Sequence, residues 1–97
     1  MIQSFGNRLA EDLYDDKDTK SGRRIPRALH RRARRKLMFL HDAAELKDLR
    51  EPPGNRLEIL KGDWKGFHSI RINDRWRIVF RWQSDNAYDV HVIDYHQ

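Results

Sequence analysis

Cysteine is absent from this chain of 97 residues, so neither a disulfide framework nor a thiolate metal site is available. No apolar run approaches the roughly 20 residues that a membrane-spanning helix needs. The N-terminal stretch MIQSFGNRLAEDLYDD carries acids where a signal peptide carries an apolar core. These absences predict a soluble, cytoplasmic protein with no membrane partner, and the length predicts a single domain over residues 1–97.

Acidic side chains are missing between Thr19 and His41, although the whole chain has 15 Asp and Glu against 20 Lys and Arg. The same stretch contains nine basic residues: Lys20, Arg23, Arg24, Arg27, Arg31, Arg32, Arg34, Arg35 and Lys36. With a net charge of +5 for the chain, this basic stripe favours a polyanionic partner such as a nucleic acid.

The N-terminal half shows helical spacing. Residues 2–5 predict a short strand and residues 8–14 a short helix. A longer helix is predicted after Pro26, because proline is tolerated in a first helical turn. Its apolar residues recur at intervals of three and four and form one stripe flanked by arginines. They are Leu29, Ala33, Leu37, Leu40 and Ala44.

Apolar residues alternate with polar ones after residues 52–55, Pro-Pro-Gly-Asn, which cannot continue a helix. Strands are predicted around residues 57–59, 70–72, 76–82 and 88–96. The first three share an apolar face that the helices are expected to cover, with Ile72 opposite Trp76 and Ile70 opposite Ile78. The predicted fold is α+β, with N-terminal helices packed on an antiparallel-rich, twisted sheet of about four to five strands.

The same register places Arg71 directly across from Arg77. Like charges that face each other across a ladder are unfavourable by up to about 1 kcal/mol. One interpretation is that an anion sits between the two guanidinium groups. The alternative is a pair of solvated arginines that are splayed apart.

Side chains suited to cleaving RNA without a metal are present near the C-terminus. Such a reaction needs a base for the 2′-hydroxyl, an acid for the leaving 5′-oxygen and cations around the phosphate. His96 can move a proton, and Asp94 or Glu58 can accept one or orient an imidazole. Tyr95 can stack on a base or hydrogen-bond the phosphate. Strict alternation, however, places Asp94 and His96 on one face of the last strand and Tyr95 on the other.

Several cations can hold phosphate groups, and arginine can do so bidentately. The candidates are Lys61, Lys65, Arg71 and Arg77 in the sheet region and Arg31, Arg34 and Arg35 on the long helix. Trp76 and Trp82 fall on the apolar period and are predicted to be core residues, whereas Trp64 and Phe67 are predicted to be exposed contacts. The histidines lack the spacing of zinc ligands, so no metal or other cofactor is predicted.

Five motifs follow one another with short gaps in the C-terminal half. They are Leu60-Lys61-Gly62-Asp63, Gly66, Ser69-Ile70-Arg71-Ile72-Asn73, Trp76-Arg77-Ile78-Val79-Phe80 and the terminal Asp94-Tyr95-His96. In this order they resemble the HigB branch of the RelE toxin superfamily. The resemblance covers the C-terminal half closely and the remainder by its layout of a short strand and helices before the sheet.

The resemblance implies ribosome-associated cleavage of messenger RNA and neutralisation by a HigA-type antitoxin with a helix-turn-helix. Operator DNA would be bound only through the antitoxin complex. Carried over by position, Asp94, Tyr95 and His96 match the family's catalytic C-terminal cluster, and Lys61 and Arg77 match its phosphate-contacting cations. Glu58 stands where some members have a catalytic histidine, and it is either the general base or part of a structural ion pair.

The predicted function is therefore a ribosome-dependent endoribonuclease toxin that uses attack of the 2′-hydroxyl on the phosphate. A non-catalytic or weakly active basic module, which acts mainly through its antitoxin complex, is the alternative. A third hypothesis is a protein that mainly regulates transcription with its partner. The basic helix from Arg27 to Lys36 is interpreted as a ribosomal RNA docking surface or as the binding face of an acidic antitoxin.

Overall fold

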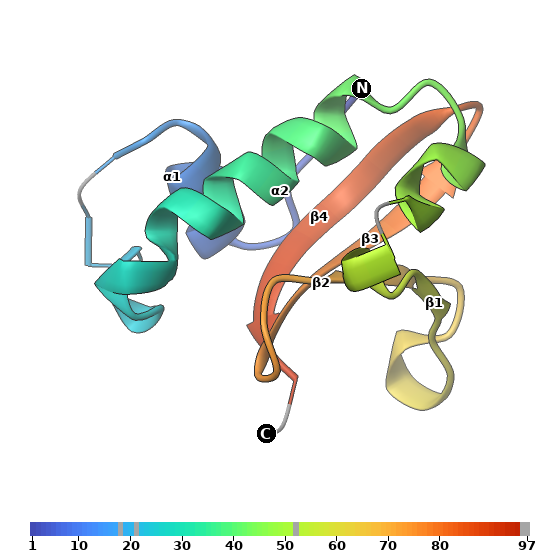
Figure 1. Cartoon of the computed structure of the whole chain (residues 1–97). Helices are drawn as coiled ribbons and strands as arrows, with labels where there is room; N and C mark the ends of the chain where they lie inside the picture. The colour runs from blue at the N-terminus through green and yellow to red at the C-terminus, as the bar shows by residue number, and fades with distance from the viewer. Residues whose placement is uncertain (18, 21, 52, 96–97) are drawn as a thin grey trace.

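Two α-helices and a four-stranded sheet form the fold in the computed structural model, which describes residues 1–17, 19–20, 22–51 and 53–95 (Figure 1). Helix α1 spans Arg8–Tyr14 and helix α2 spans His30–Asp42. The strands are β1 (Glu58–Ile59), β2 (His68–Arg71), β3 (Trp76–Gln83) and β4 (Asn86–Asp94). Neighbouring strands are antiparallel in the order β1-β2-β3-β4, which confirms the predicted α+β class. None of the helices in these ranges is long and apolar enough to cross a bilayer.

The N-terminal segment runs parallel to β4 along its outer edge. Two isolated bridges, Ile2 to Ala87 and Phe5 to Val90, are what the structure forms where a short strand was predicted. Asn7 then ends this pairing and begins α1. Its side chain accepts a hydrogen bond from the Ala10 amide at 3.0 Å and donates one to the Val92 carbonyl at 2.9 Å. One asparagine therefore caps a helix and covers a strand edge.

The main core lies between the helices and one face of the sheet. Ala33, Leu37 and Leu40 of α2 are fully buried, as are Ile70 and Ile78 of the sheet. Ile70 lies opposite Ile78, which confirms the predicted register. Of the two tryptophans predicted to be core residues, Trp76 is buried and Trp82 is half-buried against the core.

Ile59 in β1 departs from the prediction that the helices cover the apolar residues of this segment, whereas Leu57, directly before β1, does pack against the main core. Ile59 lies opposite His68, which in turn lies opposite Phe80, so Ile59 does point to the side of the helices. Its side chain is nevertheless 74% exposed. The two helices pack over β4 at the far edge of the sheet, and β1 lies beyond their reach (Figure 1).

A second, smaller apolar cluster covers part of the opposite face of the sheet, which we call the outer face. It consists of buried Leu60, Phe67 and Val79, with half-buried Trp64 packed against them. The prediction that Trp64 and Phe67 make exposed contacts is therefore wrong for Phe67, which is 8% exposed. The connection between β1 and β2 folds back over the sheet, and strand alternation does not describe such a loop.

The close approach of Gly6 to His91 generates a stability prediction. The His91 ring packs against Trp64 at a centroid distance of 5.1 Å, and a Cβ atom on Gly6 would lie 2.0 Å from its Cε1 atom. Gly6→Ala should lower the free energy of unfolding by about 1–3 kcal/mol, because the ring must move out of its cluster. Gly54→Ala is the matched control, since a methyl group added there would meet no atom within 4 Å. Equal urea midpoints for the two variants would contradict this packing.

Candidate functional site

The outer face of the sheet gathers several of the residues predicted to form the site. Glu58 lies opposite Ser69 across β1 and β2, and Arg71 lies opposite Arg77 across β2 and β3. Residues directly opposite one another point to the same side of a sheet, and side chains alternate along each strand. All four side chains therefore lie on the face away from the helices.

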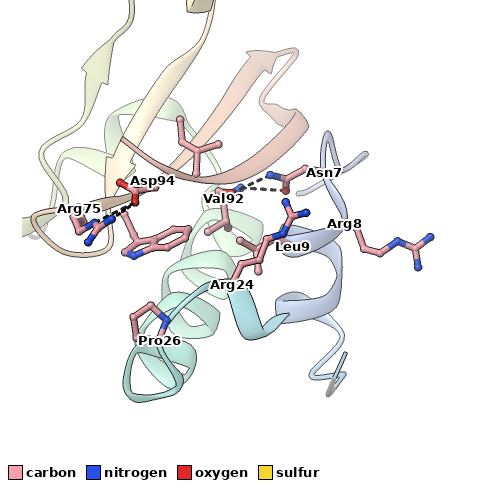
Figure 2. A pocket seen from close by; sticks show the side chains of 10 residues that line it. Asn7, Arg8, Leu9, Arg24, Pro26, Arg75, Val92 and Asp94 are labelled. Atoms are coloured by element: carbon pink, nitrogen blue, oxygen red, sulfur yellow. Dashed lines mark hydrogen bonds and ion pairs between the residues drawn. The ribbon is translucent and has the colours of Figure 1, made fainter. Parts of the chain in front are cut away.

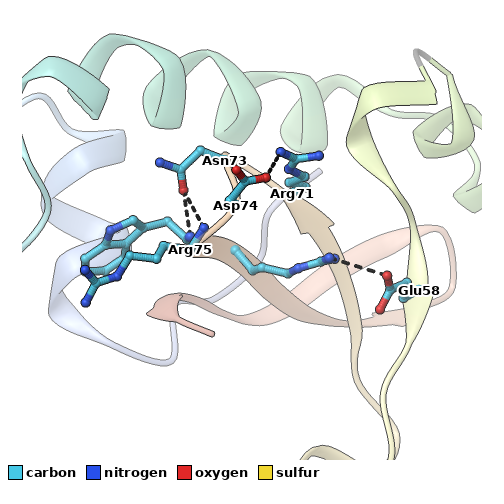
Figure 3. A network of polar contacts seen from close by, with 7 residues as sticks. Glu58, Arg71, Asn73, Asp74 and Arg75 are labelled. Carbon is cyan, nitrogen blue, oxygen red and sulfur yellow. Dashed lines mark hydrogen bonds and ion pairs between the residues drawn. The ribbon is translucent and has the colours of Figure 1, made fainter. Parts of the chain in front are cut away.

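Arg77 is the centre of this group and is only 9% exposed. Its Nη1 donates to Ser69 Oγ at 3.1 Å and to the Arg56 carbonyl at 3.4 Å. Its Nη2 contacts Glu58 Oε1 at 3.4 Å, an ion pair that Figure 3 shows at the Glu58 carboxylate. The ring of Tyr95 lies with its centroid 5.0 Å from the Arg77 guanidinium carbon, within the range of a cation–π contact. The guanidinium is thus fixed by Glu58 and Ser69, from β1 and β2 on one side, and by Tyr95, which follows β4, on the other.

Arg71 faces Arg77 across the ladder, as the register predicted, but its guanidinium turns to another carboxylate. It pairs with Asp74 in the turn between β2 and β3 (Figure 3). The two like charges are therefore each compensated by a separate acid, Asp74 and Glu58. This resembles the splayed alternative, except that Arg77 is buried and hydrogen-bonded rather than solvated.

Asp94 lies on the other face, as strict alternation predicted. It is opposite Trp76 on β3, and its Oδ2 accepts from Arg75 Nη2 at 2.6 Å and from Arg75 Nε at 3.1 Å. The hydrogen bond and the charge of Asp94 raise the pKa of Arg75. The structure therefore brings Tyr95, Glu58 and Arg77 together on the outer face and holds the Asp94 carboxylate away from them.

The remaining candidates are distributed over both sides of the molecule. Lys61 and Lys65 flank the 3-10 turn Gly62–Trp64, next to the cluster on the outer face, and both are exposed. Arg31, Arg34 and Arg35 are exposed on α2, on the opposite side of the sheet. None of these five forms an ion pair with another described residue. His96 lies outside the described residues.

Two site residues were missed by the sequence-based analysis. Ser69 is fully buried and holds the Arg77 guanidinium, and Arg75 holds Asp94. The signal for Ser69 was its position two residues before Arg71, on the same face of the strand. Arg75 lies in the turn between β2 and β3, where the alternation of side chains along a strand does not predict which way a side chain points. Over the described ranges, no three His, Asp or Glu side chains gather closely enough to hold a metal ion.

Comparison with known proteins identifies relatives that span nearly the whole chain. The family described as "RelE-like toxin of type II toxin-antitoxin system HigB" matches residues 3–96. Toxin HigB-1 of Vibrio cholerae serotype O1 is 42% identical over 82 residues, which cover 84% of each chain. Endoribonuclease HigB of Proteus vulgaris is 32% identical over 96 residues, which cover 99% of this chain and 100% of that protein.

A solved structure shares the fold at low sequence identity. A chain of the YoeB-YefM complex from Staphylococcus aureus superposes with a TM-score of 0.60 at 16% identity. The superposition covers 100% of this chain and 99% of that one. At this identity the likeness concerns the fold alone.

The hydrogen bonds of Arg77 generate a prediction about stability. Arg77→Leu should lower the free energy of unfolding by about 1–3 kcal/mol, because the buried Ser69 hydroxyl loses its partner. Arg77→Leu combined with Ser69→Ala should recover part of that loss, since the orphaned hydroxyl is removed as well.

The control for this series is Arg71→Leu, which removes the same charge from the facing position. Its partner Asp74 is 92% exposed, so the change in unfolding free energy should stay below about 1 kcal/mol. Chemical denaturation of the four proteins measures these differences. An Arg71→Leu variant as destabilised as Arg77→Leu would contradict the structural role of Arg77.

Proposed function

Because the chain belongs to the HigB family of RelE-like toxins of type II toxin–antitoxin systems, we propose that it is an endoribonuclease that cleaves messenger RNA on the ribosome. The relative from Proteus vulgaris, named an endoribonuclease, supports the activity. The observation that carries the proposal is the outer face itself. There a buried arginine is flanked by a half-exposed carboxylate and a tyrosine that is 39% exposed.

The proposed reaction is attack of the 2′-hydroxyl oxygen on the adjacent phosphorus. Glu58 accepts the hydroxyl proton, the new O2′–P bond forms and the P–O5′ bond breaks. The products are a 2′,3′-cyclic phosphate and a 5′-hydroxyl. The Glu58 side chain is 47% exposed, so its carboxylate is accessible to a bound hydroxyl. Arg77 and Lys61 would hold the phosphate and stabilise the charge that develops on it, with Arg71 and Lys65 extending the cationic surface.

The C-terminal residues receive separate roles in this proposal. Tyr95 lies over Arg77 and would hydrogen-bond the phosphate or stack on a neighbouring base. His96, the next residue along the chain, would give the leaving 5′-oxygen its proton. Asp94 would position Tyr95 and His96, because its carboxylate forms an ion pair with Arg75 on the other face and so fixes the end of β4. The Tyr95 amide also donates to the Arg75 carbonyl at 2.7 Å, so Arg75 restrains two consecutive residues.

A type II system implies a protein antitoxin, and we propose a HigA-type antitoxin with a helix-turn-helix. Operator DNA would be bound only through that complex, and the toxin would act in the cytoplasm. A second candidate function is the non-catalytic or weakly active basic module. The Glu58–Arg77 ion pair favours it, because the Glu58 carboxylate can serve to hold Arg77 in place instead of accepting a proton. The experiment on Glu58 separates the two.

Mapping of RNA 5′ ends after brief expression tests the reaction. The wild type should produce new 5′-hydroxyl ends inside translated regions, and Glu58→Gln should reduce their rate of formation by about 10²–10⁴-fold. Tyr95→Phe should also reduce the rate, whereas Glu11→Gln, an exposed position on α1, should not. New ends that carry a 5′-phosphate would rule out 2′-hydroxyl attack. Unchanged ends with wild-type protein would favour the binding module.

The exposed arginines of α2 support a docking role on the ribosome, on the side of the molecule away from the proposed cleavage site. Arg31→Glu combined with Arg34→Glu should weaken co-sedimentation with ribosomes, and the remaining binding should depend less steeply on salt. Lys47→Glu combined with Arg50→Glu reverses the same charge at Leu46–Arg50, outside α2, and should change binding much less. Equal losses for the two double variants would indicate a general charge effect instead of a docking surface.

A further inference from the structure

A large open pocket lies apart from the outer face. It has a volume of about 870 Å³ and is bordered by the start of α1, the 3-10 turn Gly22–Arg24 and the end of β4 (Figure 2). The described residues that line it include three arginines, Arg8, Arg24 and Arg75, and one acid, Asp94. We call this cavity the arginine pocket.

Two of the three arginines are not neutralised within the described chain. Arg8 and Arg24 are exposed and form no ion pair with any residue in the described ranges. In Figure 2, Arg24 extends towards Val92 while Arg8 points outwards from α1. The third arginine, Arg75, is engaged with Asp94. The pocket therefore contains one uncompensated positive charge, that of Arg24, and Arg8 places a second positive charge at its rim.

We propose that the arginine pocket docks an acidic peptide segment of a protein partner. The residues of the pocket favour an acidic ligand. The identification of this partner with the antitoxin rests on the proposed function. Carboxylates of the segment would meet Arg8 and Arg24, since a guanidinium binds a carboxylate bidentately. An apolar side chain of the segment would lie against Pro26, which is the exposed apolar residue among the described residues of the lining.

The lining favours a peptide over an RNA strand. Trp76 is the one aromatic residue among the described lining residues, and it is 9% exposed, so it offers little ring surface for stacking a base. The pocket also lies on the helix side of the sheet, whereas Arg77 and Tyr95 lie on the outer face. A segment docked in the pocket would therefore leave the outer face open.

The pocket is nevertheless coupled to the chain end that carries Tyr95. A carboxylate that enters the pocket competes with Asp94 for Arg75, and the Arg75 carbonyl also accepts a hydrogen bond from the Tyr95 amide. Docking would thus loosen the hold of Arg75 on Asp94, next to Tyr95. The partner would act on the proposed site from the helix side of the sheet, without covering the outer face.

The first test measures binding of a fluorescein-labelled, capped ten-residue peptide in which glutamates alternate with leucine and alanine. Fluorescence anisotropy with the full-length protein should show saturable binding. Arg8→Gln combined with Arg24→Gln should raise the Kd about tenfold or more, whereas Lys47→Gln combined with Arg50→Gln, with the same loss of charge, should change it less than twofold. Absence of saturable binding to the wild type, or equal weakening in both double variants, overturns the proposal.

The second test uses the internal competitor and predicts a change in the opposite direction. Asp94→Asn releases Arg75 and should tighten binding of the same peptide about threefold. Asp85→Asn adds the same net charge in the turn between β3 and β4, where its φ of 60° suits asparagine, and should leave the Kd unchanged. Tightening by both substitutions to the same degree would show that net charge, and not Arg75, is responsible.

Two further probes identify the ligand class. The same peptide with glutamine in place of glutamate should bind at least tenfold more weakly to the wild type, and equal binding would overturn the role of the carboxylates. A ten-residue uridine RNA that loses affinity in the Arg8 and Arg24 variant, while the peptide does not, would reassign the pocket to RNA. These measurements require no cleavage. Protein that binds the peptide as expected but produces no 5′-hydroxyl ends would refute the ribonuclease and leave the pocket intact.

Discussion

The burial of one guanidinium group on the outer face organises the rest of the proposed site. Arg77 is buried without the solvent that normally compensates its charge, so its neighbours must supply hydrogen-bond acceptors. Ser69 from β2, the Arg56 carbonyl and Glu58 from β1 do so, and Tyr95 lies over the guanidinium. The ion pair between Glu58 and Arg77 thereby helps to hold β1, a short and exposed edge strand, against the sheet. The same contacts leave the carboxylate half-exposed, next to a cation that is already oriented.

The period of two along β4 divides the C-terminal motif between the two faces of the sheet. Tyr95 reaches Arg77 on one face, and Asp94 reaches Arg75 on the other. These two consecutive residues therefore have different roles. Tyr95 borders the proposed cleavage site, and Asp94 anchors the end of the strand. The same division places the arginine pocket behind the site, where a partner can contact the anchor without competing with RNA for the outer face.

Sequence patterns were sufficient wherever regular periodicity continued without interruption. The pairing of Ile70 with Ile78, the facing arginines at 71 and 77, and the separation of Asp94 from Tyr95 all follow from alternation, and the structure confirms them. Alternation could not predict that residues 61–67 fold back over the sheet and bury Phe67, because that depends on tertiary packing. It also could not predict the exposure of Ile59, which reflects how far the helices extend. The partners Ser69 and Arg75 were missed because side-chain hydrogen bonds, between two strands for Ser69 and from a turn to a strand for Arg75, require a geometry that a one-dimensional pattern does not contain.

The proposed cleavage depends on contact between Arg77, on the outer face, and the scissile phosphate. Arginine side-chain NMR of the full-length protein, titrated with an RNA whose cleavage-site nucleotide lacks its 2′-hydroxyl, tests it directly, because such an RNA binds without being cut. We expect the Nε–H resonance of Arg77 to shift with saturation while that of Arg75 does not move. A shift confined to Arg75, with Arg77 unchanged, would contradict the assignment of the outer face as the RNA-cleaving surface.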